Sequence, residues 1–143
     1  MIHLNIGSNL ESKFGTRFEN ITLAINLLIN SKLKIKKISN FYSSPSYPNK
    51  KLHSFLNVGV SANSEYDETI LINQINLIEE KIGRTRSKKN DPRVCDIDII
   101  DFNGLIIESG NLKIPHKKFI LISSIDESKN SPYGISKRIW RGL

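Results

Sequence analysis

Segments with strand-like alternation and segments with helical spacing follow one another along this chain, and their order limits the folds it can adopt. Apolar residues at every second position predict strands, whereas apolar residues three and four positions apart predict helices. Strands are predicted at 2–7, 33–45, 55–63 and 96–102, with a short one at 105–107, and helices at 11–30 and 67–83. The order β-α-β-β-α-β is typical of a ferredoxin-like α+β fold: an antiparallel sheet with two helices on one face and substrate loops on the other.

Local signals mark several element ends. Asp67 is a suitable N-cap, and Gly83 stands where the second helix should stop, because glycine adopts the left-handed conformation that ends many helices. Pro45 should end the second strand, and Asn103-Gly104 should form a turn before the short strand. The buried stripe of the second helix is predicted at Ile70, Leu71, Ile75, Ile78 and Ile82, and that of the first at Phe14, Phe18, Ile21, Ile25 and Leu28.

Length and composition indicate a globular protein of one domain, 1–143. No apolar run approaches the roughly 20 residues of a membrane helix, and the N-terminal residues lack the cationic start of a signal peptide. The single cysteine, Cys95, excludes an internal disulfide and fits a reducing cytosol. Its apolar neighbours indicate a small buried side chain rather than a zinc ligand. We expect a cytoplasmic monomer with no membrane partner.

The net charge is +7, with a pI of about 9.6. Such an excess of basic residues suits a polyanionic partner, either a nucleic acid or a polyphosphate nucleotide. The alternative is a lysine-rich surface that is simply solvated. Charge alone does not separate these possibilities.

Two carboxylates interrupt the apolar pattern of the fourth strand. Asp96 and Asp98 are two residues apart, so their side chains project from one face, while Cys95, Ile97 and Ile99 face the core. Neighbouring carboxylates repel each other, and both stay ionised only with a cation beside them. Mg²⁺ is the natural candidate, because it takes oxygen ligands from carboxylates and substrate phosphates. Spacing alone also allows an exposed strand face with lysine partners.

A basic segment precedes this carboxylate pair. It contains Arg84, Arg86, Lys88, Lys89 and Arg93. Guanidinium groups match the geometry of phosphate, so such a cluster beside a possible metal site favours phosphoryl chemistry. Each basic residue taken singly could equally be a solvated loop charge.

Three further side chains are candidates for binding. Phe55 and Asn57 share one face of the third strand, where they could stack on and hydrogen-bond a flat heterocycle. Plain packing is the alternative for Phe55. His116 follows Pro115 in a lysine-rich segment and could donate to a phosphate oxygen, or could be a surface residue.

Six short motifs together resemble the 6-hydroxymethyl-7,8-dihydropterin pyrophosphokinase family. In chain order they are 6-IGSNL-10, 41-FYSSP-45, 55-FLNVGV-60, 79-EEKIGRTR-86, 92-PRVCDIDII-100 and 114-IPH-116. Their order and spacing agree with the family pattern, above all PR-x-x-D-x-D after G-R-x-R. The resemblance runs from residue 2 to about residue 116.

The resemblance implies transfer of pyrophosphate from ATP to the pterin hydroxymethyl group, with release of AMP, in folate biosynthesis. It implies two Mg²⁺ ions between Asp96, Asp98 and the ATP phosphates. The residues implied to bind ATP are Glu79, Arg84, Arg86, Arg93, Ile99 and His116. Of these, Arg84 and Arg93 are catalytic candidates, together with Asp98 near the pterin hydroxyl. Gly7 would let the first strand approach the substrate closely. The residues implied to line the pterin pocket are Gly7, Ser44, Pro45, Tyr47, Phe55, Asn57 and Phe119.

The chain departs from the family pattern after His116. The segment 116–125 reaches Phe119 almost at once and lacks the arginine and the Pro-Leu pair of the family. Phe119 is the candidate for the aromatic residue that stacks on the pterin, and Lys117 or Lys118 for the missing charge. These differences concern catalytic rate rather than fold, because an arginine that acts in the transition state can contribute orders of magnitude.

Three functional hypotheses result. The first is an active pyrophosphokinase in which loops 44–54 and 84–92 close and exclude water. The second is a relative that binds nucleotide or pterin but barely turns over. The third is a basic RNA-binding module, which would need paired exposed aromatic residues on adjacent strands. The chain offers Phe55 without a convincing partner, so we expect small-molecule substrates and no nucleic acid.

Overall fold

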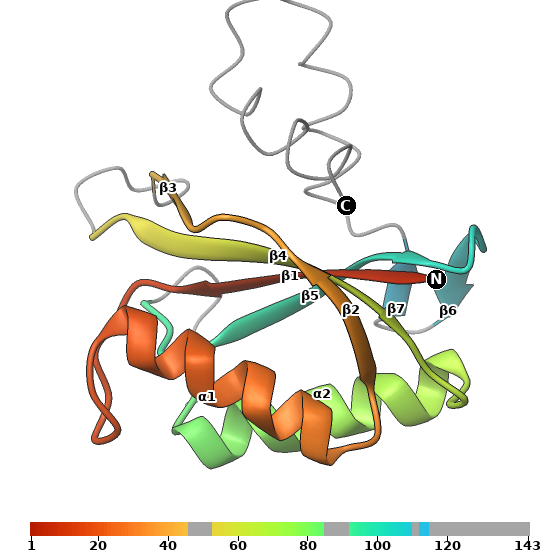
Figure 1. The fold of residues 1–143 in the computed structure, drawn as a ribbon, viewed down its shortest axis with the longest axis horizontal. Coiled ribbons are helices and arrows are strands. Elements are labelled where there is room, and N and C mark those ends of the chain that lie inside the picture. The colour runs from red at the N-terminus through yellow and green to blue at the C-terminus, as the bar shows by residue number, and fades with distance from the viewer. Residues whose placement is uncertain (46–52, 85–91, 110–111, 115–143) are drawn as a thin grey trace, which may run out of the picture.

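The computed structural model describes residues 1–45, 53–84, 92–109 and 112–114. Its elements are β1 (Ile2–Ser8), α1 (Arg17–Asn30), β2 (Lys34–Ile38), β3 (Tyr42–Ser44), β4 (Phe55–Asn63), α2 (Glu68–Ile82), β5 (Asp96–Phe102), β6 (Ile107–Ser109) and β7 (Leu112–Ile114). The main sheet has the order β2-β4-β1-β5, with β3 also paired to β4, and its neighbouring strands are antiparallel. Both helices lie against one face of this sheet (Figure 1). The predicted ferredoxin-like α+β fold is confirmed.

The central strand β1 separates an apolar face from a polar one. Ile2, Leu4 and Ile6 are fully buried, and Asn5 between them points to the opposite face. The core also includes Ile21, Ala24 and Leu28 of α1, Val58, Val60 and Ala62 of β4, four residues of α2, and Cys95, Ile97, Ile99 and Phe102 in or beside β5. The apolar face is therefore covered by the helices, and the polar face is left for other functions.

A β-bulge in β5 keeps its large apolar side chains in the core. The register between β1 and β5 shifts at Ile100, so that this residue has no opposing residue in β1. Ile99 and Phe102 are each 4% exposed, although an uninterrupted strand would turn them to opposite faces. The bulge thus places Phe102 in the core and leaves Asp101 partly exposed.

The first helix begins later than predicted. Instead of starting near residue 11, α1 begins at Arg17, after the N-cap Thr16. Thr16 and Glu19 form a capping box, which satisfies backbone N–H groups at the helix start and fixes its position. Phe14 therefore lies outside the helix and is 43% exposed, and Phe18 in its first turn is 53% exposed. Neither belongs to the buried stripe.

The second helix has the predicted ends. The Asp67 side chain accepts a hydrogen bond from the Ile70 N–H at 2.8 Å, and Gly83 ends the helix in the left-handed conformation. Leu71, Ile75, Ile78 and Ile82 are buried as predicted, but Ile70 is 42% exposed. Neighbouring helix residues are about 100° apart, so Ile70 cannot share the narrow stripe that begins at Leu71. Among the described helices, none is long and apolar enough to cross a membrane.

The segment 33–45, predicted as one strand, forms the two strands β2 and β3. The interruption is stabilised by Ser39, whose Oγ accepts a hydrogen bond from the Gly59 N–H at 2.8 Å. The Ser39 N–H donates to the Gly59 carbonyl, also at 2.8 Å. The bond from the Gly59 N–H to Ser39 Oγ takes the place of a regular backbone bond of the sheet, and β2 ends there. As predicted, the strand stops before Pro45.

The short strand predicted at 105–107 begins instead at Ile107, as β6. Asn103 and Gly104 form the predicted turn, with φ angles of 53° and 74°. The residues directly after this turn leave the main sheet, and β6 pairs with β7 in a separate ribbon. The turn was therefore predicted correctly, and the start of the strand was placed too early.

The buried thiol of Cys95 gives a first prediction. Cys95 is fully buried, and desolvation, followed by the negative charge of Asp96, raises its pKa from 9.0 to about 12. A shift of this size lowers the thiolate fraction at pH 8 by roughly a thousandfold. We expect iodoacetamide to leave Cys95 unmodified in the native protein at pH 8 and to modify it fully in denaturant, as measured by intact mass. Rapid native labelling would contradict this burial.

Candidate active site

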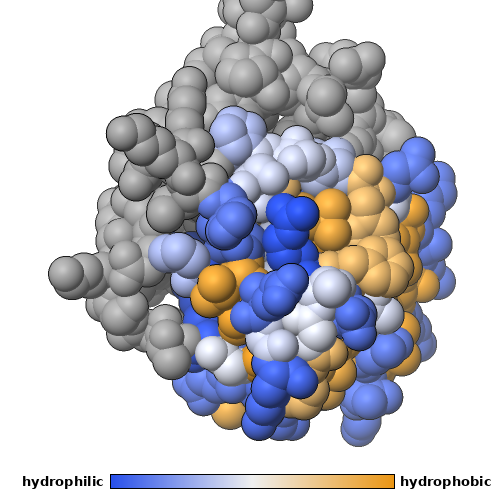
Figure 2. All heavy atoms as spheres, turned by 90° about the vertical axis from the view of Figure 1, so that its left-hand side faces the viewer, coloured by the Kyte–Doolittle hydropathy of each residue, from blue (hydrophilic) through white to orange (hydrophobic). Residues whose placement is uncertain are grey.

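Polar side chains gather on the sheet face opposite to the helices, at the end where β1 stops and β4 and β5 begin. Gly7 of β1 pairs with Asn57 of β4 on one side and with Asp96 of β5 on the other. Asn5 lies opposite Asp98. Figure 2 looks onto this end of the molecule, where hydrophilic surface lies beside apolar surface. The antiparallel register thus brings together residues that are far apart in the sequence.

Two arginines bind the nearly buried carboxylate of Asp96, which is 7% exposed. Arg84 Nη1 lies 3.3 Å from Asp96 Oδ1, and Arg93 Nη1 lies 2.9 Å from Oδ2. Arg84 also forms an ion pair with the buried carboxylate of Glu79. Charge-assisted hydrogen bonds of this kind offset the cost of removing a carboxylate from water. The basic residues therefore explain how an aspartate can be buried at the start of an apolar strand.

The end of α2 positions Arg84 beside Asp96. Gly83 has a φ of 111°, and its N–H contacts the carbonyls of Glu79 and Glu80. The Arg84 N–H donates to the Glu79 carbonyl at 3.0 Å. This Schellman-type end turns the chain back over the last helical turn. The glycine that stops the helix therefore also directs the arginine toward the site.

Asn9, the residue after β1, fixes the backbone of Arg93. Asn9 Oδ1 accepts a hydrogen bond from the Arg93 N–H at 2.7 Å, and the Asn9 N–H donates to the Arg93 carbonyl at 3.0 Å. Asn9 is 2% exposed, so these bonds are shielded from water. The Arg93 guanidinium therefore extends from a fixed point toward Asp96. Asn9 was missed as a site residue, although it stands in the motif 6-IGSNL-10.

A group of side chains on β1, β3 and β4 forms what we call the amide wall: Asn5, Tyr42, Ser44, Phe55 and Asn57. Asn57 is 6% exposed, and its Nδ2 donates to Ser44 Oγ at 2.8 Å. Its Oδ1 accepts from Asn5 Nδ2 at 3.4 Å. Asn5 Oδ1 in turn accepts from the Tyr42 hydroxyl at 2.7 Å. The wall is therefore held by a continuous series of hydrogen bonds across three strands.

Asn5 and Tyr42 were not among the predicted site residues. Asn5 could have been found from the sequence, because the alternation that places Gly7 on the polar face places Asn5 there too. Tyr42 could have been found in the same way, because in the predicted strand 33–45 it is two residues from Ser44 and shares its face. Its pairing with β4 in β3 brings it to the wall.

Gly7 lies directly beside the amide wall. A Cβ atom at this position would lie 2.9 Å from Asn57 Oδ1 and 3.3 Å from Phe55 Cδ1. From the sequence, we expected the substrate to lie directly against Gly7. In this structure the side chains of Asn57 and Phe55 occupy that space, so the immediate need for glycine comes from packing within the sheet.

Most of the predicted site residues that the structure describes meet at this end of the sheet: Gly7, Ser44, Phe55, Asn57, Glu79, Arg84, Arg93, Asp96 and Asp98. Pro45 follows β3 and is exposed. Ile99 was expected to bind ATP, but its side chain lies in the hydrophobic core and does not reach the polar face. Four predicted site residues lie outside the described residues: Tyr47, Arg86, His116 and Phe119. The same holds for most of the loops 44–54 and 84–92 and for the segment 116–125.

Asp96 and Asp98 are the candidates for metal binding. Within the described ranges, no group of three or more His, Cys, Asp and Glu side chains is placed to bind a metal. Mg²⁺ does not need such a group, because it commonly takes one or two carboxylates and completes its shell with water and phosphate. The donor set therefore fits a Mg²⁺ ion that is shared with a phosphorylated ligand.

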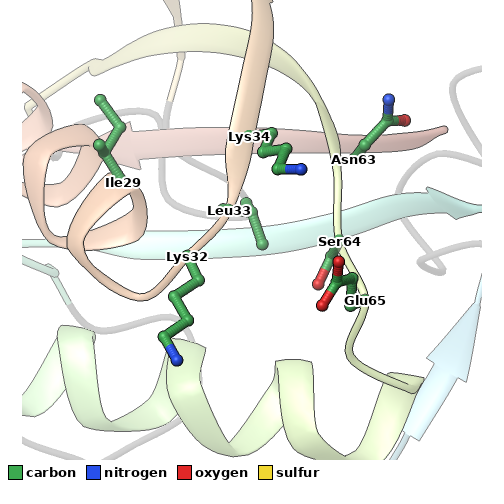
Figure 3. A pocket seen from close by; sticks show the side chains of 7 residues that line it. All are labelled: Ile29, Lys32, Leu33, Lys34, Asn63, Ser64 and Glu65. Carbon is green, nitrogen blue, oxygen red and sulfur yellow. The ribbon is translucent and has the colours of Figure 1, made fainter.

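A groove at the far end of β4 is distinct from this site. It has a volume of about 440 Å³ and is lined by Ile29, Lys32, Leu33, Lys34, Asn63, Ser64 and Glu65. Figure 3 shows these side chains coming from the end of α1, the turn into β2 and the start of that strand, and from the end of β4 and the two residues after it. The lining offers one carboxylate and no aromatic ring, so it lacks the groups that phosphoryl transfer to a heterocycle requires. We therefore place the candidate active site at the polar end of the sheet.

Comparison with known proteins identifies relatives of the chain. The family described as 7,8-dihydro-6-hydroxymethylpterin-pyrophosphokinase matches residues 3–123. The chain is 35% identical to the folic acid synthesis protein FOL1 of Dictyostelium discoideum over 91% of its own length and 20% of the relative. It is 34% identical to the bifunctional protein FolKE of Lactococcus lactis strain IL1403, over 81% of the chain and 32% of the relative.

A third relative has a length closer to that of the chain. The 2-amino-4-hydroxy-6-hydroxymethyldihydropteridine pyrophosphokinase of Aquifex aeolicus is 33% identical over 80% of the chain and 69% of the relative. The matches to the Dictyostelium and Lactococcus proteins, in contrast, span only a fifth and about a third of those longer proteins. The similarity therefore concerns one part of each of them.

The contact between Gly7 and the amide wall gives a second prediction. We expect Gly7→Ala to lower the free energy of unfolding by about 1–3 kcal/mol, because the added Cβ overlaps a hydrogen-bonded amide that has little room to move. Urea denaturation monitored by circular dichroism would measure the change.

The matched control for this prediction is the same substitution in an Asn57→Ala background. With the Asn57 amide removed, the cost of Gly7→Ala should shrink or change sign, because alanine also restricts the unfolded chain. An equal cost in both backgrounds would contradict the proposed overlap.

Proposed function

The chain belongs to the 7,8-dihydro-6-hydroxymethylpterin-pyrophosphokinase family, and on this premise we propose that it transfers pyrophosphate from ATP to 6-hydroxymethyl-7,8-dihydropterin and releases AMP. The family predicted from the sequence motifs is thereby confirmed. Two relatives are named as folic acid synthesis and pteridine pyrophosphokinase proteins. These names support a role of the product in folate synthesis.

The observation that carries this proposal is the meeting of a carboxylate pair, two arginines and an amide wall at one end of the sheet. Phosphoryl transfer needs positive charge around the phosphates and a fixed position for the attacking oxygen, with little covalent chemistry from the protein. Arg84 and Arg93 supply the charge. Asn57 and Ser44 supply polar atoms that can orient a flat heterocycle, beside the ring of Phe55.

Arg84 and Arg93 both bind Asp96 in this structure. We infer that they turn to the phosphates of ATP when it binds, because a phosphate offers the guanidinium fork a bidentate partner of greater negative charge. Glu79 would keep Arg84 anchored during this exchange. Asp96 would then be released from its arginine partners and become available as a metal ligand.

Asp96 and Asp98 would hold Mg²⁺, and the family resemblance leads us to expect two ions. Bound Mg²⁺ would neutralise phosphate charge and stabilise the attacking and leaving oxygens of an in-line displacement. Asp98 is less buried than Asp96 and lies across from Asn5 of the amide wall. This position suits a carboxylate that orients the pterin hydroxymethyl oxygen toward the β-phosphorus of ATP.

The resemblance supplies further proposed contacts. Arg86 and His116 would bind phosphate oxygens, and Pro45, Tyr47 and Phe119 would line the pterin pocket. Because the Ile99 side chain is in the core, any contact of Ile99 with ATP would come from its backbone.

The second hypothesis is a relative that binds nucleotide or pterin but barely turns over. It differs from this proposal only in the catalytic rate. That difference concerns the segment 116–125, where the sequence lacks the family's arginine. Calorimetry that shows ATP binding, in a protein that forms no AMP with the pterin, would favour the weakened relative. The family assignment supports small-molecule substrates over RNA.

The carboxylate pair gives a third prediction. We expect Asp98→Asn to lower kcat by roughly a hundred- to a thousandfold, because the amide is a poor Mg²⁺ ligand and removes a negative charge at the reacting groups. Its melting temperature should stay close to that of the wild type, since Asp98 is only partly buried. Asp96→Asn should lose activity and also stability, because Arg84 and Arg93 lose their shared carboxylate.

The control for these variants is Asp101→Asn, which makes the same charge change on the same strand. Asp101 accepts a hydrogen bond from the Gly104 N–H at 3.2 Å, which an amide oxygen can also accept. AMP formation and thermal denaturation would be measured for all three variants. Wild-type activity in Asp98→Asn, or equal losses in Asp98→Asn and Asp101→Asn, would contradict the assignment.

Removal of the metal gives a fourth prediction. With excess EDTA, we expect AMP formation to fall to background and to return when Mg²⁺ is added in excess. Ca²⁺ should restore less activity, because it prefers longer bonds and more ligands than Mg²⁺. Undiminished turnover in EDTA would refute a metal role for Asp96 and Asp98.

A further inference from the structure

We propose that Asn5 is a positioning residue for pterin binding, which holds the Asn57 amide in one of its two possible orientations. The inference deepens the proposed function and rests on it. Asn5 belongs to none of the motifs that identified the family, and its role is inferred from its contacts in the sheet.

The contacts of Asn57 set the direction of the hydrogen bonds in the amide wall. Asn57 Nδ2 lies 3.4 Å from the backbone carbonyl of Phe55 and 2.8 Å from Ser44 Oγ. A backbone carbonyl only accepts hydrogen bonds, so the Asn57 atom facing it must be the donor Nδ2. Asn57 Oδ1 therefore points toward β1 and needs a donor there.

Asn5 provides that donor. Its Nδ2 lies 3.4 Å from Asn57 Oδ1, and its own Oδ1 accepts from the Tyr42 hydroxyl at 2.7 Å. The oxygen and nitrogen of an amide are assigned from their partners, and here the assignment follows stepwise from the Phe55 carbonyl. Tyr42 must then act as the donor to Asn5, which locks the Asn5 amide as well.

The fixed orientation determines what the wall offers to a ligand. Both hydrogens of Asn57 Nδ2 have partners, whereas Oδ1 uses one lone pair for Asn5 and keeps a second as an acceptor. Ser44 Oγ accepts from Asn57, and within the described residues its hydroxyl donates to no partner. The wall thus presents an acceptor at Asn57 and a donor at Ser44. If the Asn57 amide were rotated so that Oδ1 and Nδ2 exchanged places, the wall would present a donor at Asn57 instead of an acceptor.

Asn5 also lies between the two halves of the proposed site. It is the cross-strand neighbour of Asp98 on β5 and bonds to Asn57 on β4. Directly opposed residues of an antiparallel pair have Cβ atoms about 5 Å apart. An aspartate at position 5 would therefore bring a carboxylate next to Asp98 and also face Asn57 Oδ1 with another acceptor.

The test is steady-state kinetics of Asn5→Leu, Asn5→Asp and Tyr42→Phe. Leucine has the same branching and the same number of side-chain heavy atoms as asparagine but cannot donate to Asn57, so we expect the KM for the pterin to rise roughly three- to tenfold while the KM for ATP changes little. Asn5→Asp should have the larger effect. Tyr42→Phe should act through Asn5, so its effect on the pterin KM should be small in an Asn5→Leu background.

The matched control is Asn63→Leu, which makes the same change at an exposed amide at the far end of β4, beside the groove in Figure 3. It should leave both KM values unchanged. A wild-type pterin KM in Asn5→Leu, equal changes in both KM values, or additive effects of Asn5→Leu and Tyr42→Phe would overturn the inference. If the wild-type protein forms no AMP, the proposed function fails instead.

A second measurement follows the Asn57 amide without any substrate. In ¹H–¹⁵N spectra, Tyr42→Phe should shift the side-chain NH₂ resonances of Asn57 more in the wild-type background than in the Asn5→Leu background, where only the direct cross-strand pairing of Tyr42 with Asn57 remains. Equal shifts in both backgrounds would show that Asn5 does not connect Tyr42 to Asn57.

Discussion

The bonds of Asp96 to Arg84 and Arg93 join three parts of the protein at one point: the end of α2, the segment before β5, and β5 itself. A nearly buried carboxylate is tolerated there only because both of its oxygens have guanidinium partners. The left-handed Gly83 directs one arginine, and Asn9 fixes the backbone of the other. The arginines that allow Asp96 to be buried therefore lie where an anion of greater negative charge would bind in the proposed function.

The division of the sheet into two faces gives this ion-pair cluster its setting. One face is closed by α1 and α2 (Figure 1). The alternation of β1 places its polar residues on the other face. There Gly7 leaves room for the Asn57 side chain, and Asn5 connects that side chain to the strand that faces Asp98. Asp96 and Asp98 thus lie on a strand adjacent to the amide wall, so their position relative to it is set by backbone hydrogen bonds.

Features with a local cause were predictable from the sequence. The ends of α2 follow from Asp67 and Gly83, and the burial of Cys95 follows from its apolar neighbours. The start of α1 was misplaced because the capping box at Thr16 outweighs the apolar spacing before it. The division of 33–45 into β2 and β3 depends on Ser39 bonding to Gly59 of β4, a contact that no pattern within the segment reveals.

The sequence by itself determined the order of the elements, the shared face of Asp96 and Asp98, the basic segment before them, and the motifs that identify the family. Only the tertiary structure decided which partners these groups have: the arginines on Asp96, the backbone clamp by Asn9, and the bonds that run from Tyr42 through Asn5 to Asn57. Alternation assigns a side chain to a face, but its neighbours depend on the register between strands. That register is set by packing and hydrogen bonds among distant segments, which the local pattern of residues does not contain.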